Sequence, residues 1–143
     1  MSEGLKLTVT EKNEPPPELF SNNQPVWQMV QGELKQICVS QTGDHIWGVN
    51  ELDNIYYRNG IDASWERVEG FLKQLSVDGD HVWGVNKFDN VYYRNGRHGE
   101  WLRVEGFLKQ VHVSNGGAHV WGVNDANEIY FREGIDGSWK KMS

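Results

Sequence analysis

The sequence contains a single cysteine, Cys38, and therefore cannot form an intrachain disulfide. This excludes the class of small secreted domains that depend on several disulfides, and it favours a reducing compartment. The first residues carry neither a basic leader nor a long apolar segment, and no apolar run in the chain is long enough to span a bilayer. We therefore expect a cytoplasmic protein without a transmembrane segment, with leaderless secretion left open.

Basic residues are also scarce. Lys and Arg number 14 against 20 Asp and Glu, which gives a formal net charge of -6. Proteins that bind nucleic acid draw their affinity from clustered Lys and Arg placed against phosphates. We therefore expect no nucleic-acid partner.

The chain also lacks the helical period of 3.6 residues over any useful length, whereas one short pattern occurs three times. The pattern is His-Ile/Val-Trp-Gly-Val-Asn, and its tryptophans are Trp47, Trp83 and Trp121. These tryptophans lie 36 and 38 residues apart. A period near 37 residues identifies a repeat architecture.

Each period contains four short runs rich in Val, Ile, Trp and Tyr, separated by turn signals such as Asn95-Gly96 and Asp136-Gly137. Four short antiparallel strands per period form the blade of a β-propeller. The sequence thus predicts an all-β fold with three blades over residues 25–143. Residues 1–24 contain Pro15-Pro16-Pro17 and are predicted to be a flexible arm, with residues 5–10 as a candidate edge strand.

One kind of strand is in excess. A Trp-containing outer strand is predicted four times, at Trp27, Trp65, Trp101 and Trp139, whereas the other three strand types occur three times each. Thirteen strands are one more than three blades need. We expect the surplus strand to be exchanged with a second chain.

Two further motifs recur with the same period. Gly-x-Leu-Lys-Gln begins at Gly32, Gly70 and Gly106, and Trp-Gly-Val-Asn is followed each time by Ile/Val-Tyr. With these motifs, residues 26–142 resemble the tectonin repeat. That repeat is shared by tachylectin-1-like and fish-egg lectins, fungal tectonins and tectonin-repeat proteins of animal membrane traffic.

The resemblance implies a closed propeller of about six blades, so that this chain, with three, is expected to self-associate with a second chain. It also implies a lectin that binds glycans through repeated sites, with innate defence as a setting. The alternative is an intracellular protein-interaction or membrane-trafficking module that binds no sugar. A third reading is that the chain is a fragment or an engineered piece of a longer propeller.

The candidate sugar-binding residues share one property, which is that each recurs at an equivalent place in every repeat. For the asparagines the alternative is a hydrogen bond to the turn backbone, for the arginines a solvated strand edge, and for the tryptophans core packing. As ligand contacts, amides bind hydroxyls, and an Arg beside an aromatic ring suits a sugar or an anionic group. The candidates are Asn50, Asn86, Asn124, Tyr57, Tyr93, Phe131, Arg58, Arg94, Arg132, Trp65, Trp101 and Trp139.

Other repeated residues are expected to be structural. Trp47, Trp83 and Trp121 lie in the most apolar strand and are predicted to pack between blades. The repeated histidines that open the pattern are spread around a ring and are not expected to bind a metal. We expect no cofactor and no enzymatic activity, because no nucleophile, phosphate loop or cysteine pair stands out.

Overall fold

A computed structural model describes residues 26–143 of the chain. The chain divides into two units, residues 1–31 and residues 32–143, and all the described strands belong to the second unit. The predicted arm, residues 1–24, and the candidate edge strand within it lie outside the described residues.

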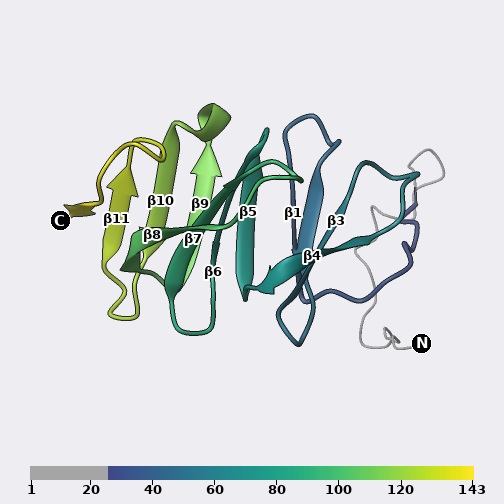
Figure 1. Ribbon diagram of the computed structural model, residues 1–143, viewed down its shortest axis with the longest axis horizontal. Coiled ribbons are helices and arrows are strands. Elements are labelled where there is room, and N and C mark those ends of the chain that lie inside the picture. Colours follow the sequence, from purple (N-terminus) through teal and green to yellow (C-terminus); the bar gives the residue numbers. More distant parts are fainter. Residues whose placement is uncertain (1–25) are drawn as a thin grey trace. The chain divides into compact units, whose positions relative to one another are not determined.

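The second unit contains three four-stranded antiparallel sheets in sequence order (Figure 1). The first sheet consists of β1 (Gln36–Val39), β2 (Ile46–Val49), β3 (Asn54–Arg58) and β4 (Glu66–Phe71). The second consists of β5 (Gln74–Asp78), β6 (His81–Val85), β7 (Asn90–Asn95) and β8 (Leu102–Phe107). The third consists of β9 (Gln110–Ser114), β10 (His119–Val123), β11 (Ile129–Arg132) and β12 (Lys140–Met142). The predicted all-β meander of three blades is confirmed.

The glycine of each Trp-Gly-Val-Asn motif lets a leucine pack against its strand. In the second sheet Gly84 pairs with Leu75 across β5 and β6. A β-carbon at Gly84 would lie 2.7 Å from Cδ1 of Leu72, and one at Gly48 would lie 2.5 Å from Cδ1 of Leu34. These distances leave no room for a side chain, which explains why the motif has glycine there.

Neighbouring sheets pack face to face around two apolar clusters, with β1 beside β5 and β5 beside β9. Trp47 and Trp83 are buried in these clusters, as predicted. Trp121 is the exception, because it lies on the face of the third sheet that no other described sheet covers.

One strand prediction is wrong. Residues 26–31, which match the outer strands β4 and β8 in sequence, form no strand, and Trp27 is exposed. The physical reason is pairing: β4 pairs with β3 of the sheet before β5, whereas the described residues contain no sheet before β1. Residues 26–143 therefore contain twelve strands in place of the expected thirteen.

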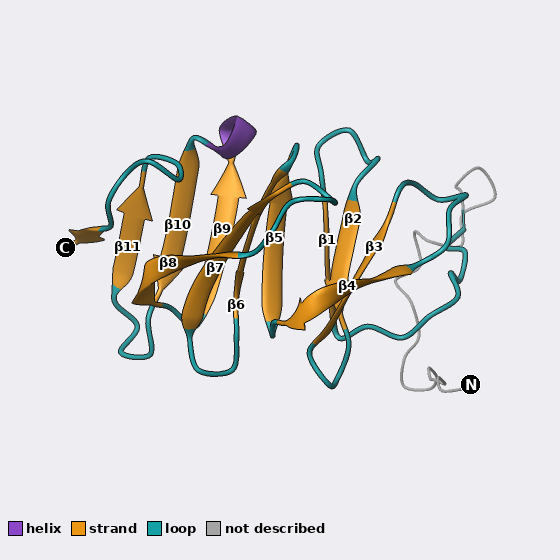
Figure 2. Cartoon of the chain, viewed as in Figure 1, coloured by secondary structure: helices purple, strands orange, loops and turns teal. Residues whose placement is uncertain are grey.

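A single helical turn, η2 (Asn115–Gly117), lies between β9 and β10 (Figure 2). Within residues 26–143 there is accordingly no helix with the length and apolar character needed to cross a membrane.

Candidate functional site

The three repeated arginines are buried, so they are not the solvated edge charges that were the alternative to a ligand contact. Arg94 is 1% exposed, and its guanidinium donates to the carbonyls of Gly96 at 3.0 Å and Arg97 at 2.7 Å. Arg58 and Arg132 are also buried and bond in the same way to the carbonyls of the turns that follow them. The guanidinium groups fold back onto the turns because they are buried from water and the turn carbonyls accept their hydrogen bonds.

Two of these arginines also fasten one sheet to the next. The guanidinium of Arg94 lies 5.7 Å from the ring centroid of Trp47 in the first sheet and 4.9 Å from that of Trp101 in its own. It also pairs with Glu69 of the first sheet at 3.3 Å. Burial lowers the pKa of Arg94, and the Glu69 carboxylate opposes that shift. Arg132 repeats this arrangement with Trp83, Trp139 and Glu105 in the next pair of sheets.

Two of the three aromatic residues that precede the arginines belong to the core. Tyr57 and Tyr93 are almost fully buried, and their hydroxyls lie 2.8 Å and 2.7 Å from Nδ1 of His45 and His81. Burial raises the pKa of both tyrosines. Phe131 has no hydroxyl and packs against Trp121. The expected Tyr/Phe-Arg ligand sites are therefore not open between the described sheets.

The asparagines that end the Trp-Gly-Val-Asn motif hold a turn. Oδ1 of Asn86 accepts hydrogen bonds from the backbone N–H groups of Phe88 at 3.0 Å and Asn90 at 2.9 Å. Asn50 and Asn124 make the equivalent pairs. Nδ2 of Asn124 donates to Glu128, which lowers the pKa of that carboxyl. Nδ2 of Asn86 bonds to no residue within 26–143, so this amide has a donor left for a ligand.

The outer-strand tryptophans are half-buried. Nε1 of Trp101 donates to the carbonyl of Glu69 at 2.8 Å, and Trp139 makes the same bond to Glu105. Trp65 lies over Arg58, with the ring centroid 5.0 Å from the guanidinium carbon. The two hydrogen bonds anchor Trp101 and Trp139 to the sheet before each, while part of each ring stays accessible.

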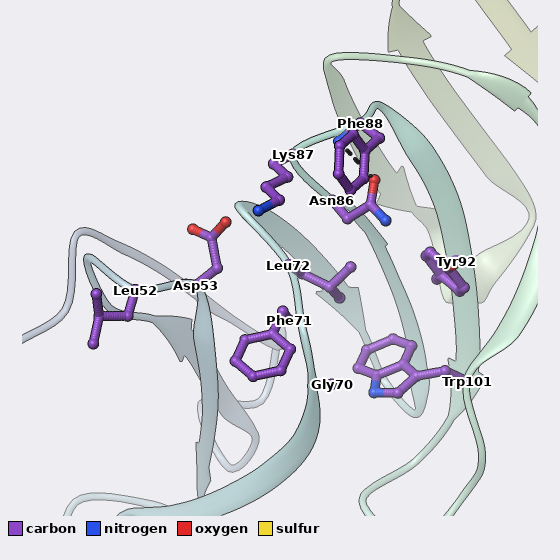
Figure 3. Close-up of a pocket in the computed structure, with 10 residues that line it drawn as sticks. All are labelled: Leu52, Asp53, Gly70, Phe71, Leu72, Asn86, Lys87, Phe88, Tyr92 and Trp101. Atoms are coloured by element: carbon purple, nitrogen blue, oxygen red, sulfur yellow. Dashed lines mark hydrogen bonds between the residues drawn. The ribbon is translucent and has the colours of Figure 1, made fainter.

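A groove of about 590 Å³ lies between the first and second sheets, where Asn86 and Trp101 come together (Figure 3). Its residues come from the β2–β3 turn, the end of β4, the β6–β7 turn, β7 and the segment before β8. They are Leu52, Asp53, Gly70, Phe71, Leu72, Asn86, Lys87, Phe88, Tyr92 and Trp101.

Aromatic surface and a few polar groups meet in this groove. Phe71 is 62% exposed and Phe88 66%, and both line the same groove. Asp53 is held by an ion pair with Lys35 at 2.7 Å, and Figure 3 shows the ammonium of Lys87 on the side of Asp53. Such a site can stack an apolar ring face and bond polar substituents at the same time.

The repeat pattern identified only part of this groove. Asn86 and Trp101 were expected, whereas Asp53, Phe71, Lys87 and Phe88 were missed. The available signal was departure from the repeat. Phe71 corresponds to Glu33 in the first repeat and recurs as Phe107 in the third. Lys87-Phe88 corresponds to Glu51-Leu52 and Asp125-Ala126, so this turn varies where the scaffold does not.

Comparison with known proteins agrees with the geometry. The chain is 43% identical over 61 residues to Tectonin-2 of Physarum polycephalum, covering 43% of this chain and 17% of that protein. A YCF48 structure with a bound D1 peptide superimposes with a TM-score of 0.62 at 13% identity, over 76% of this chain and 40% of that one. The Cps50 (Swd1) β-propeller domain of Myceliophteria thermophila gives 0.59 at 10% identity, over 80% and 39%.

The structural matches show a β-propeller fold, and the chain spans well under two thirds of each of these proteins. The family model for the tectonin domain matches residues 8–143, nearly the whole sequence. This chain, built of three four-stranded repeats, therefore belongs to the tectonin family.

Proposed function

We propose that this protein is a glycan-binding module without catalytic activity, and that the groove between the first and second sheets is a sugar site. The observation that carries the proposal is the exposed pair Phe71 and Phe88 beside a polar cluster in one groove. A pyranose has an apolar face of C–H groups and a rim of hydroxyls. Aromatic rings accept the first, and amide, carboxylate and ammonium groups bond the second.

The polar residues of the groove have complementary roles in this proposal. Nδ2 of Asn86 donates to a hydroxyl, because its Oδ1 is already used by the turn. Asp53 accepts from a hydroxyl while Lys35 holds its carboxylate in place. Lys87, whose ammonium lies 5.3 Å from the ring centroid of Phe88, supplies a donor at the rim, which also suits a sugar that carries a negative substituent.

The equivalent position between the second and third sheets differs in three residues. It retains Asp89, Phe107, Asn124 and Trp139, but Phe88, Asp125 and Ala126 stand where the groove has Leu52, Lys87 and Phe88. We therefore propose that the two positions differ in affinity, with the first preferred. The net charge of -6 favours neutral sugars over strongly anionic glycans at both.

The proposal includes self-association and a biological setting. Joining copies repeats the groove on one rigid assembly, which raises the avidity for a surface that displays many glycans. Recognition of a microbial surface, in innate defence, is a use for such avidity. We also propose a cytoplasmic location, in keeping with the single free cysteine.

A second candidate function is a protein-interaction module. The rim of the groove exposes Leu52 together with Phe71 and Phe88, and exposed apolar side chains that cluster often bind protein partners. The structural neighbour YCF48 was solved with a bound peptide, although its likeness concerns the fold alone.

A glycan array probed with the full chain tests the first proposal. Phe71→Ala is expected to lower the signal at least tenfold, while its matched comparison Phe107→Ala, at the weaker position between the second and third sheets, lowers it much less. Circular dichroism and a melting curve confirm that each variant is folded. If the folded protein binds no glycan on the array, the sugar site is refuted and the interaction module takes its place.

A further inference from the structure

The first sheet leaves apolar residues uncovered on one face. Ile37 of β1 is 58% exposed and Val39 of the same strand is 56% exposed. Their counterparts in the second sheet, Leu75 and Val77, are 1% and 6% exposed because the first sheet covers them. Within residues 32–143, no sheet covers β1 in that way.

The third sheet leaves the opposite face uncovered. Trp121, Ile129 and Met142 are each between 41% and 45% exposed. Their counterparts in the second sheet are Trp83, Val91 and Val104, which are buried against the third sheet. The two uncovered faces are thus the two halves of the interface that the chain already forms twice within itself.

At each internal interface a glutamine amide makes two hydrogen bonds to the backbone of the next sheet, here called the glutamine clamp. In the described part of the chain this clamp is missing at the two uncovered faces. Oε1 of Gln36 in β1 accepts a hydrogen bond from the backbone N–H of Leu75 in β5 at 3.0 Å, and Nε2 of Gln36 donates to the carbonyl of Leu75 at 2.9 Å. Gln74 holds Val111 of β9 in the same way, at 2.8 Å and 2.7 Å. Gln110 of β9 is exposed, and no residue of the described chain bonds to its side chain. The residue that corresponds to Leu75 and Val111 is Ile37.

The stack of an arginine between two tryptophans is also incomplete at the two uncovered faces. Arg94 lies between Trp101 of its own sheet and Trp47 of the sheet before it. Arg58 lies over Trp65 of its own sheet, but no tryptophan from a preceding sheet contacts it among the described residues. Trp121, whose counterparts Trp47 and Trp83 receive an arginine from the next sheet, receives none.

We infer that the third sheet of one copy docks on the first sheet of a second copy, so that two chains close one ring through two identical joints. In each joint Gln110 clamps the backbone of Ile37, and Trp121 covers Arg58 and Trp65. Two copies of three sheets give six blades, within the range of four to eight that propellers adopt, whereas three copies would give nine. The inference extends the self-association part of the proposed function and is independent of sugar binding.

The joint also differs from the internal interfaces. Glu69 and Glu105, which pair with Arg94 and Arg132, correspond to Gln31 in the first repeat and to Ser143 in the third sheet, and neither is acidic, so Arg58 gains no ion pair there. We therefore expect the joint to be weaker than the internal interfaces and to depend on apolar contact. It places Asn127 of one copy beside Asn50 and Trp65 of the next, at positions that match Asp53, Asn86 and Trp101, so the second copy completes a further groove.

Sedimentation equilibrium of the full chain, without sugar, tests the inference. The wild-type protein is expected at twice the 16.5 kDa chain mass. Ile37→Asp is expected at the mass of one chain, because it introduces a charge into the joint. Gln110→Ala is expected to raise the dissociation constant at least about tenfold, as loss of an interface anchor typically does. Phe107→Asp, an equally exposed apolar site away from both uncovered faces, is the control and stays a dimer.

Three results would overturn the inference. One is a wild-type protein that remains a single chain at high micromolar concentration, which would mean that another polypeptide covers the faces. Another is a mass other than twice that of the chain. The last is a dimer that both joint variants leave intact, which would place the contact elsewhere. A dimer that binds no glycan would refute the sugar site alone.

Discussion

Asn86 shows how one side chain can hold a turn and still have a donor to offer. Its Oδ1 accepts two backbone hydrogen bonds across the β6–β7 turn. Asn86→Ala leaves both N–H groups without this acceptor and should lower the free energy of unfolding by about 1–3 kcal/mol. Asn86→Asp keeps an acceptor oxygen and should retain most of that stability while it removes the Nδ2 donor. Urea unfolding of both variants separates the two roles, and equal stability of Asn86→Ala and wild type would contradict the turn role.

Cys38 provides a test of burial at a single residue. The Cys38 side chain packs against the core cluster, and burial raises its pKa to about 12. A raised pKa means that the folded state holds the proton more tightly than the unfolded chain, whose thiol has a pKa of about 8.5. The contribution of the Cys38 thiol to the free energy of unfolding is therefore fully present below the pKa of the unfolded chain and is lost as pH rises toward 12.

We expect the Cys38 thiol to react slowly with a disulfide reagent at pH 8 in the native protein and rapidly in urea. The reacting species is the thiolate, and native Cys38 forms very little of it at that pH. Cys38→Ser supplies the blank for the assay. Equal rates in native and unfolded protein would show that the thiol is not protected.

The connections between sheets can be tested at the scale of the element, where β4 leads into β5. Gly70 has a φ of +105°, and a β-carbon there would lie 3.1 Å from Nε1 of Trp101. Gly79, in the β5–β6 turn, has a φ of +60° and nothing within 4 Å of a β-carbon. Gly79→Ala should therefore lower the free energy of unfolding only by the strain of alanine in a left-handed backbone conformation, about 1–2 kcal/mol. Gly70→Ala should lower the free energy of unfolding by more than this, because it also displaces the indole of Trp101, which binds the first sheet.

Thermal unfolding of Gly70→Ala and Gly79→Ala in parallel gives the comparison. The larger loss is expected for Gly70→Ala, with a weakened Trp101 fluorescence signature in the native state. If the two variants melt together, the contact with Trp101 contributes nothing beyond the backbone strain.

Strand order within each sheet was predictable because the repeat fixes it. Four apolar runs per period, with Gly and Asn at the turns, leave few alternatives to a meander. The direction of Arg94 was not predictable, because a long charged side chain at a strand end can extend into water or fold back. The turn carbonyls of Gly96 and Arg97 decide between these, and they become visible only when the turn is built.

At the scale of the whole molecule, the sequence predicted the number of blades, whereas most of the candidate ligand residues have structural contacts that the sequence did not specify. Periodicity identifies what all repeats share, and what they share here is mainly scaffold: the Trp–Arg stack, the buried tyrosines and the turn asparagines. Lys87 and Phe88 differ between repeats, and Phe71 recurs only as Phe107, so a search for residues shared by all three repeats passes over them. The surplus Trp27 segment failed as a strand because strand formation needs a neighbouring sheet, which a sequence pattern does not supply.

Joining two chains should change binding to a surface far more than binding to a free sugar. A second groove on the same rigid assembly meets a surface glycan at a local concentration of roughly millimolar, which raises avidity by about 10²–10⁴. Ile37→Asp retains the groove of each chain but is expected to prevent assembly. At equal chain concentration it should therefore bind a glycan-coated sensor at least about a hundredfold more weakly than wild type. Titration calorimetry with the free sugar should give both proteins the same affinity. If both bind the coated sensor equally, the assembly does not supply the avidity, even where each groove binds sugar.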